Sequence, residues 1–162
     1  MNTWTGALTV TAAVGSGLVG GVFFAFSGFV MPALTRLPTA AGVTAMQAIN
    51  VTATTPPLMT ALFGTAVAAV AVPVVAWRVG ADHPAQVLVW VAGGIYLLGV
   101  VGVTVGASVP LNDQLALTAP GAMADGTWTR WVDRWTTYNH VRTASALAAA
   151  AIYCAALLRA PS

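Results

Sequence analysis

The chain has 162 residues, of which 58% are hydrophobic and only 6% are charged, against roughly 25% charged residues in a typical soluble domain. An ordinary soluble globular fold is excluded, and we expect a single integral membrane domain over residues 1–162. Six arginines and four aspartates give a net charge of +2 without a basic stripe, so no nucleic-acid partner is expected.

The first apolar segment, at about residues 4–34, carries no charge and exceeds the roughly 20 residues that cross a bilayer. We predict that it is the first membrane helix, kinked or ended by Pro32, because proline cannot donate to the preceding turn. Small residues four apart (Gly17–Gly21 here, Gly102–Gly106 further along) predict that the first and third helices cross closely. Glycines that a membrane helix simply tolerates are an equal alternative.

A less apolar stretch follows at residues 39–50, and it contains Gln47 and Asn50 but no charged side chain. We expect a short helix there, which either lies at the membrane interface or folds back into the bundle. The second span is predicted at about residues 58–77, since the two prolines before it suit the first turn of a helix.

The third span is predicted at about residues 86–107, and the proline-containing stretch 108–113 is predicted to end it with a turn. Beyond a polar region, Trp and Tyr recur every three or four residues up to position 138. These side chains prefer the headgroup level of a bilayer. They predict a second interfacial helix at residues 129–138, ahead of a fourth span at about residues 141–158.

The expected fold is an all-α integral membrane four-helix bundle with short interfacial helices between helices 1 and 2 and between helices 3 and 4. Both interfacial helices and the 108–113 turn then share one side of the membrane, while the chain ends and the 79–84 loop share the other. The arginines do not decide which side is cytoplasmic.

No sequence repeat is visible and the second and third helices lack a mid-membrane charge, which argues against a transporter. Glycine-rich faces leave a homo-oligomer open.

A polar run at residues 138–143 stands where the last span begins, and six of the ten charged residues lie between Asp113 and Arg142. Charged groups beside lipid are unfavourable, so such a cluster indicates a function. On a helix, Asn139 and Arg142 share one face, with His140 one step round.

Arg142 needs an anionic partner, and Asp113 is the natural candidate because it lies on the adjacent turn. The specific expectation is a contact between one of Asn112 and Asp113 and one of Asn139, His140 and Arg142. Other polar side chains expected to join this pocket are Asn50, Gln47, Arg36 and Thr143. A polar clamp that only fixes the helix ends is the structural alternative.

Metal-binding patterns are not visible in the sequence. The chain contains no glutamate and no H-x-x-H or C-x-x-C spacing, and its two histidines, His83 and His140, are expected on opposite sides of the membrane. We therefore expect no metal and no cofactor. A copper site formed by His140 with Met31 or Met46 is the weaker alternative.

Five segments together resemble the anthrone oxygenase-like family of small bacterial and fungal membrane proteins, much of which is known only as a domain of unknown function. They are residues 21–34, 45–50, 109–113, 135–143 and the small-residue helix that follows. The pairing of Val-Pro-Leu-Asn with Trp-x-x-x-Asn-His-x-Arg is the distinctive part. The resemblance implies a four-helix bundle in the bacterial inner membrane. It also implies the chemistry of the fungal relatives, which oxidise polyketide anthrones to anthraquinones with O2.

The residue types suit a cofactor-independent oxygenase for an anthrone-like, phenolic or quinol-like polycycle, because the deprotonated substrate can reduce O2 without metal or flavin. His140 is the expected base. Asp113 orients Arg142 or His140, and the oxyanion stabilisers are Asn112, Asn139 and Arg142. The expected substrate-binding residues are Phe24, Phe26, Trp135, Tyr138, Asn50, Gln47 and Thr143. Substrate and O2 are expected to enter from the lipid. The alternative is a non-enzymatic lipid- or quinone-binding module or scaffold.

Overall fold

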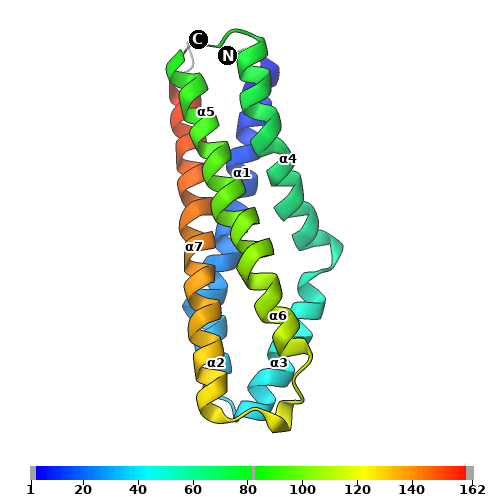
Figure 1. Cartoon of the computed structure of the whole chain (residues 1–162). Helices are drawn as coiled ribbons and strands as arrows, with labels where there is room; N and C mark the ends of the chain where they lie inside the picture. The colour runs from blue at the N-terminus through cyan, green and yellow to red at the C-terminus, as the bar shows by residue number, and fades with distance from the viewer. Residues whose placement is uncertain (1–2, 82, 160–162) are drawn as a thin grey trace.

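A computed structural model describes residues 3–81 and 83–159, and within these ranges every regular element is a helix. Four helices are long and apolar enough to cross a membrane: residues 3–34, 56–78, 83–116 and 125–158 (Figure 1). The predicted all-α fold class and the four-helix membrane bundle are therefore confirmed, and the protein is a multi-pass membrane protein.

The elements follow one another in four spans with short helices between them. The first span consists of α1 (Thr3–Ala25), the π-helical segment η1 (Phe26–Val30) and α2 (Met31–Leu34). After α3 (Thr39–Ala53), the second span is α4 (Pro56–Arg78). The third span consists of α5 (His83–Tyr96), the π-helical segments η2 (Leu97–Gly102) and η3 (Thr104–Ser108), and α6 (Val109–Ala116). The short 3₁₀ helix η4 (Pro120–Ala122) precedes the last span, α7 (Asp125–Leu158).

The spans form a square in which α1 and α5 each pack against both α4 and α7. Close approach depends on Gly20, where an added Cβ would meet Ala146 and Leu147 of α7, and on Gly93, where it would meet Ala69 of α4. The predicted crossing of the first and third helices through Gly17–Gly21 and Gly102–Gly106 is wrong, because an added Cβ at Gly17, Gly21 or Gly106 meets nothing within 4 Å.

Pro32, Pro73 and Pro110 are accommodated inside long spans rather than ending them, and two of them follow a π-helical segment. Pro32 follows the π-helical segment η1, and Pro110 follows η3. A proline ring crowds the carbonyl four residues earlier, and a wider π turn gives that carbonyl room. The first span therefore continues to Leu34. The predicted turn at 108–113 is wrong, because those residues are helical and the third span ends only at Ala116.

The predicted interfacial helix at 129–138 is also wrong as a separate element, because α7 is continuous from Asp125 to Leu158. A helix of this length measures about 51 Å, whereas the hydrocarbon layer is about 30 Å thick. The first third of α7 therefore extends beyond the apolar layer. Near it lie α2, α3 and α6, and α3 runs back along the bundle (Figure 1). We call these four parts the cap.

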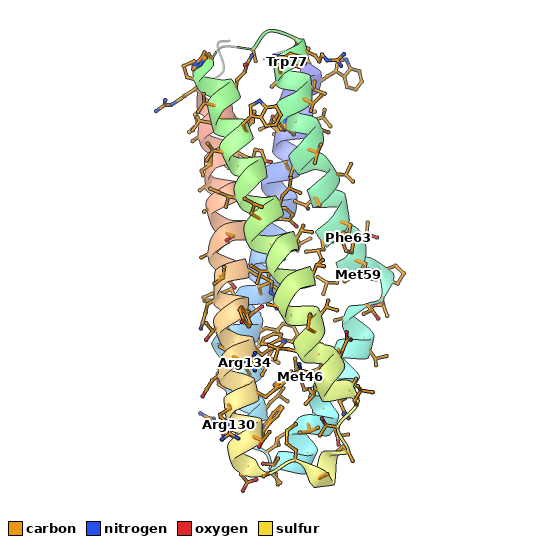
Figure 2. The ribbon with its side chains drawn as sticks, viewed as in Figure 1. Met46, Met59, Phe63, Trp77, Arg130 and Arg134 are labelled. Atoms are coloured by element: carbon orange, nitrogen blue, oxygen red, sulfur yellow. The ribbon has the colours of Figure 1, made fainter. Side chains whose placement is uncertain are left out.

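The cap has its own hydrophobic core, separate from that of the membrane bundle. Its centre is formed by Met31, Met46, Leu115 and two stacked indoles, Trp128 and Trp131, whose ring centroids lie 5.5 Å apart. The tryptophan periodicity thus marks a buried face of α7. In the other core, small and aromatic side chains of the four spans pack together. Figure 2 shows Arg130 and Arg134 at the cap end and Trp77 at the opposite end, near the chain termini.

Gly93→Ala is expected to lower the free energy of unfolding by about 1–3 kcal/mol, because the new Cβ would clash with the backbone carbonyl oxygen of Ala69. The matched control is Gly94→Ala, whose Cβ meets nothing within 4 Å. That change should be neutral or stabilise the helix by up to about 1 kcal/mol. Unfolding of the purified variants in detergent micelles measures the difference, and equal stabilities would contradict the close packing of α5 on α4.

Candidate functional site

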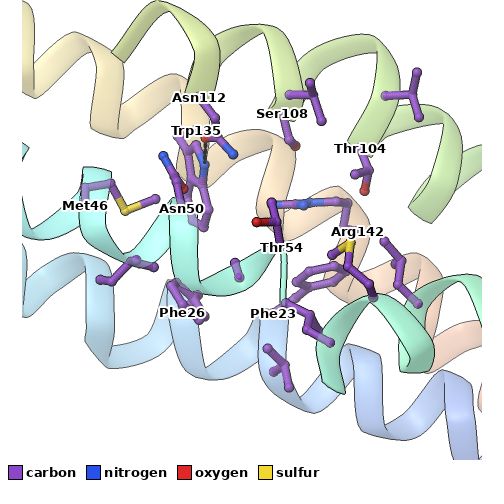
Figure 3. Close-up of a pocket in the computed structure, with 18 of the residues that line it drawn as sticks. Phe23, Phe26, Met46, Asn50, Thr54, Thr104, Ser108, Asn112, Trp135 and Arg142 are labelled. Carbon is purple, nitrogen blue, oxygen red and sulfur yellow. Dashed lines mark hydrogen bonds between the residues drawn. The ribbon is translucent and has the colours of Figure 1, made fainter. Parts of the chain in front are cut away.

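A cavity of about 190 Å³ lies where the membrane core meets the cap core (Figure 3). Its wall includes Phe23 and Leu62 from the first core and Met46 and Trp135 from the second. All four spans and α3 contribute to it. A closed cavity of about 150 Å³ can hold benzene, and this one is partly open, so it has room for an aromatic ring system.

Arg142 places a buried positive charge on the wall of this cavity. Its side chain is 6% exposed, and its guanidinium lies 4.3 Å from the ring centroid of Phe23 and 5.5 Å from that of Trp135. Such cation–π contacts stabilise a cation by about 0.5–2 kcal/mol. One guanidinium nitrogen donates to Asn139 Oδ1 at 2.9 Å, while Nε has no hydrogen-bond partner in the described part of the chain.

No acidic side chain within residues 3–81 and 83–159 pairs with Arg142. The predicted ion pair with Asp113 is wrong, because the Asp113 side chain is exposed to solvent. A buried charge without a partner is unfavourable by several kcal/mol. The cavity is therefore suited to a ligand that brings negative charge or a strong hydrogen-bond acceptor.

Asn139 joins α7 to the first span beside the start of its π-helical segment. Its Nδ2 donates to the Phe23 carbonyl oxygen and to Ser27 Oγ, both at 2.6 Å. Asn139 does not line the cavity. Asn139 holds the first span, which forms part of the cavity wall, against α7, and it positions Arg142. The structure gives no support for a direct contact between Asn139 and a substrate oxyanion.

Five further polar side chains line the cavity, and two of them, Thr54 and Thr104, donate their hydroxyls to backbone carbonyls of their own helical turns. Asn112 Oδ1 accepts a hydrogen bond from Trp135 Nε1 at 3.0 Å, which orients both side chains. Ser108 Oγ and Asn50 Nδ2 are buried and have no hydrogen-bond partner within the described residues. Together with Arg142, these residues place unpaired donors on the wall of one hollow (Figure 3).

Of the residues predicted for the site, the structure brings five to the cavity: Asn50, Phe26, Asn112, Trp135 and Arg142. The predicted contact between one of Asn112 and Asp113 and one of Asn139, His140 and Arg142 has its nearest counterpart in the pair Asn112 and Arg142. Asn112 and Arg142 share the cavity, but the hydrogen bond of Asn112 goes to Trp135.

His140 is separated from the cavity. It is exposed and lies along a surface groove between the first span and α7, with Asp133 and Met31. One residue step turns an α-helix by about 100°, so the neighbour of a buried Asn139 points elsewhere. The expectation that His140 shares a pocket with Arg142 is therefore wrong.

The remaining predicted binding residues also lie outside the cavity. Phe24 is 63% exposed on the outer face of α1. Gln47 Nε2 donates to the carbonyl oxygens of Leu115 and Thr118, which fastens α3 to the end of α6. Thr143 Oγ1 donates to Asn139 O within its own helix, and Tyr138 packs against the cap core.

Sequence reasoning missed Phe23 and Ser108. Ser108 stands one turn before Asn112, so a third span extended through Pro110 places both side chains on one face. Phe23 stands one turn before Phe26. Ser108 was not predicted because the third span was expected to end at about residue 107. Phe23 was not predicted because Phe24 was chosen in its place.

The polar cavity wall consists of amides, hydroxyls and a guanidinium. Met46 also lines it, whereas Met31 lies with His140 in the separate groove. Within residues 3–81 and 83–159, no three His, Cys, Asp or Glu side chains gather in a group that could hold a metal ion.

These features define a class: a small helical membrane protein with a cation-bearing, aromatic-lined cavity between two cores. A family model described as anthrone oxygenase matches residues 46–152, which is more than half of the chain, and the protein belongs to this family. The matched region contains Asn50, Ser108, Asn112, Trp135 and Arg142. The chain matches none of the curated proteins and none of the solved structures with which it was compared.

Asn139→Ala is expected to lower the free energy of unfolding by about 1–3 kcal/mol, because it leaves the Phe23 carbonyl and Arg142 without their partner. Thr137→Ala is the matched control on the same helix, since the exposed Thr137 hydroxyl bonds only its own helix backbone. That control should stay within about 0.5 kcal/mol of the unmodified protein. Chemical unfolding in micelles compares the two, and a similar loss in both would contradict the bracing role of Asn139.

Proposed function

We propose that this protein is a membrane-embedded oxygenase that oxidises an anthrone-like or other phenolic or quinol-like polycycle with O2 in the cavity beside Arg142. The observation that carries the proposal is the buried guanidinium that faces a cavity and has no anionic partner among residues 3–81 and 83–159. Membership of the anthrone oxygenase family supports the class of reaction.

The first step is binding of the substrate as an oxyanion. The rings of Phe23, Phe26 and Trp135 offer apolar faces for a flat polycycle. Arg142 Nε and Ser108 Oγ then donate hydrogen bonds to its oxygen. A positive charge within about 4–6 Å favours the ionised form of an acidic group, so Arg142 promotes loss of the proton from the carbon opposite the carbonyl.

The proton acceptor in this proposal is water rather than a side chain. The described residues of the cavity wall include no imidazole and no carboxylate, and His140 lies in a different groove. In place of a dedicated base, Arg142 and Ser108 lower the free energy of the substrate anion. Their positions are fixed, so they need not rearrange as negative charge develops on the substrate.

The second step is oxidation of this anion. One electron passes to O2, which gives a substrate radical and superoxide, and the two combine to form a C–O bond. The resulting peroxide takes up a proton. Loss of water then breaks the O–O bond and the remaining C–H bond of that carbon, which leaves a carbonyl group. The sum is substrate plus O2 to ketone plus water, so the reaction balances without a metal or flavin.

The proposed partners are a hydrophobic small molecule and O2, both taken from the bilayer. We further propose a bacterial inner (plasma) membrane as its location; four apolar helical spans support an inner over an outer membrane, because outer-membrane proteins cross the bilayer as closed barrels.

The test is oxygen uptake by purified variants with anthrone as substrate. Arg142→Gln is expected to lower kcat by about 10²–10³-fold, the usual effect of removing one oxyanion donor. His140→Ala is expected to stay within about threefold of the unmodified protein, since surface substitutions away from a site have small effects.

A strong loss in His140→Ala with full activity in Arg142→Gln would overturn the assignment of the cavity. If the unmodified protein consumes no O2 above the spontaneous oxidation of anthrone, the enzymatic proposal fails for this substrate. The non-enzymatic binding module then becomes the better description.

A further inference from the structure

The open side of the cavity faces the flank of the bundle rather than either end. Phe63 of α4, Val105 of η3 and Val109 of α6 line it, and all three are exposed on the outer surface. We call these three residues the mouth. Figure 1 shows α4 diverging from the third span towards the bend at residues 54–55, and Figure 2 places Met59 and Phe63 on α4 near that bend.

The mouth opens within the apolar layer, close to its cap-side edge. The second span is α4, 23 residues long, which corresponds to about 34 Å and therefore to one crossing of the hydrocarbon layer. Phe63 is seven residues from the start of this helix, about 10 Å along its axis. Acyl chains of the bilayer can thus reach the mouth directly.

The inner end of the cavity has the opposite character. Arg142 is 6% exposed and Ser108 is 2% exposed, and each has a polar atom that finds no partner among the residues that the structure describes. Between this inner end and the mouth, the wall contains Leu58, Met59 and Leu62. The hollow is therefore polar and cationic at its deep end and apolar at its lipid end.

We propose that this cavity binds a long-chain fatty acid, with its carboxylate on Arg142 and its acyl chain passing through the mouth into the bilayer. A guanidinium matches a carboxylate in charge and in hydrogen-bond geometry. The proposal uses the cavity of the proposed oxygenase but requires no turnover. A fatty acid in this position neutralises Arg142 when no aromatic substrate is present, and the substrate must displace it.

The size of the cavity favours a fatty acid over a phospholipid. A volume of about 190 Å³ admits a carboxylate and the first part of one chain, judged by the roughly 150 Å³ that holds benzene. A phospholipid would have to bring its phosphate, its glycerol and the origins of two chains to the same buried guanidinium. The remaining methylenes of a single chain stay in the bilayer, where they already were.

The experiment measures saturable binding of oleate to the purified full-length protein in a non-ionic detergent by titration calorimetry. Oleyl alcohol, which has the same chain and no charge, is expected to bind at least about tenfold more weakly, since hydrogen bonds to charged groups are the stronger ones. Arg142→Gln should weaken oleate binding by a similar factor. Arg134→Gln, which removes an exposed arginine of the same helix, should not change it.

Three results would overturn the proposal: no saturable oleate binding, equal affinity for oleyl alcohol, or unchanged oleate binding by Arg142→Gln. Competition by dioleoylphosphatidylglycerol as strong as that of oleate would also overturn it in favour of a phospholipid. None of these results bears on oxygen uptake with anthrone, so the failure of this proposal and the failure of the oxygenase proposal are distinguishable.

A second pair of variants covers the case in which Arg142→Gln does not fold. Val105→Trp narrows the mouth from an exposed position and is expected to weaken oleate binding at least about tenfold. Val67→Trp adds the same side chain to an exposed position of α4 outside the cavity and should leave binding unchanged. Equal binding by both tryptophan variants would contradict passage through the mouth.

Discussion

The side-chain amide of Asn139 determines how the last span sits on the first. It donates to the backbone of Phe23 and to Ser27, and it accepts from Arg142. The guanidinium of Arg142 also lies over the ring of Phe23. Asn139 therefore positions both the charged group and the aromatic ring that it contacts. Because Asn139 is fully buried, water cannot replace these hydrogen bonds. The position of Arg142 is therefore as rigid as the contact between the two helices.

The cavity exists because two separately packed cores meet without filling the space between them. The membrane core consists of small residues and a few aromatic rings, so the four spans approach closely. In the cap, large indoles and methionines fill the core, and Figure 1 shows α4 diverging from the third span towards it. A change from close to wide helix spacing within one bundle leaves a gap at the transition. The bend at residues 54–55 lies at this level.

Hydropathy was sufficient to predict four helical spans, because the free energy of placing about 20 apolar residues in lipid outweighs local preferences. It could not predict where the helices end. Composition changes where a helix leaves the hydrocarbon layer, and here the third and fourth helices continue well beyond that boundary. Pro110 and the polar residues after it were therefore mistaken for a turn, although the preceding π-helical segment keeps the helix intact.

Arg142 was found in the sequence because a charge in a membrane helix is unfavourable unless something uses it. The aromatic contacts of its guanidinium were not predicted. Phe23 and Trp135 stabilise the charge through their ring faces, and no sequence spacing links aromatic rings on two different helices to one guanidinium. His140 was a plausible neighbour in sequence, but the turn of the helix directs it away from Asn139.

The π-helical segment η1 also has a consequence for the rotational phase of the first span. It accommodates one more residue than an α-helix would in the same number of turns, so every residue before it is rotated by about 100° relative to an uninterrupted helix. Phe23 faces Arg142 only in this phase. Removal of one residue from the segment, such as the exposed Gly28, would restore a regular helix and turn Phe23 away from the charge. The one extra residue in η1 thus determines that the ring of Phe23 is directed towards Arg142.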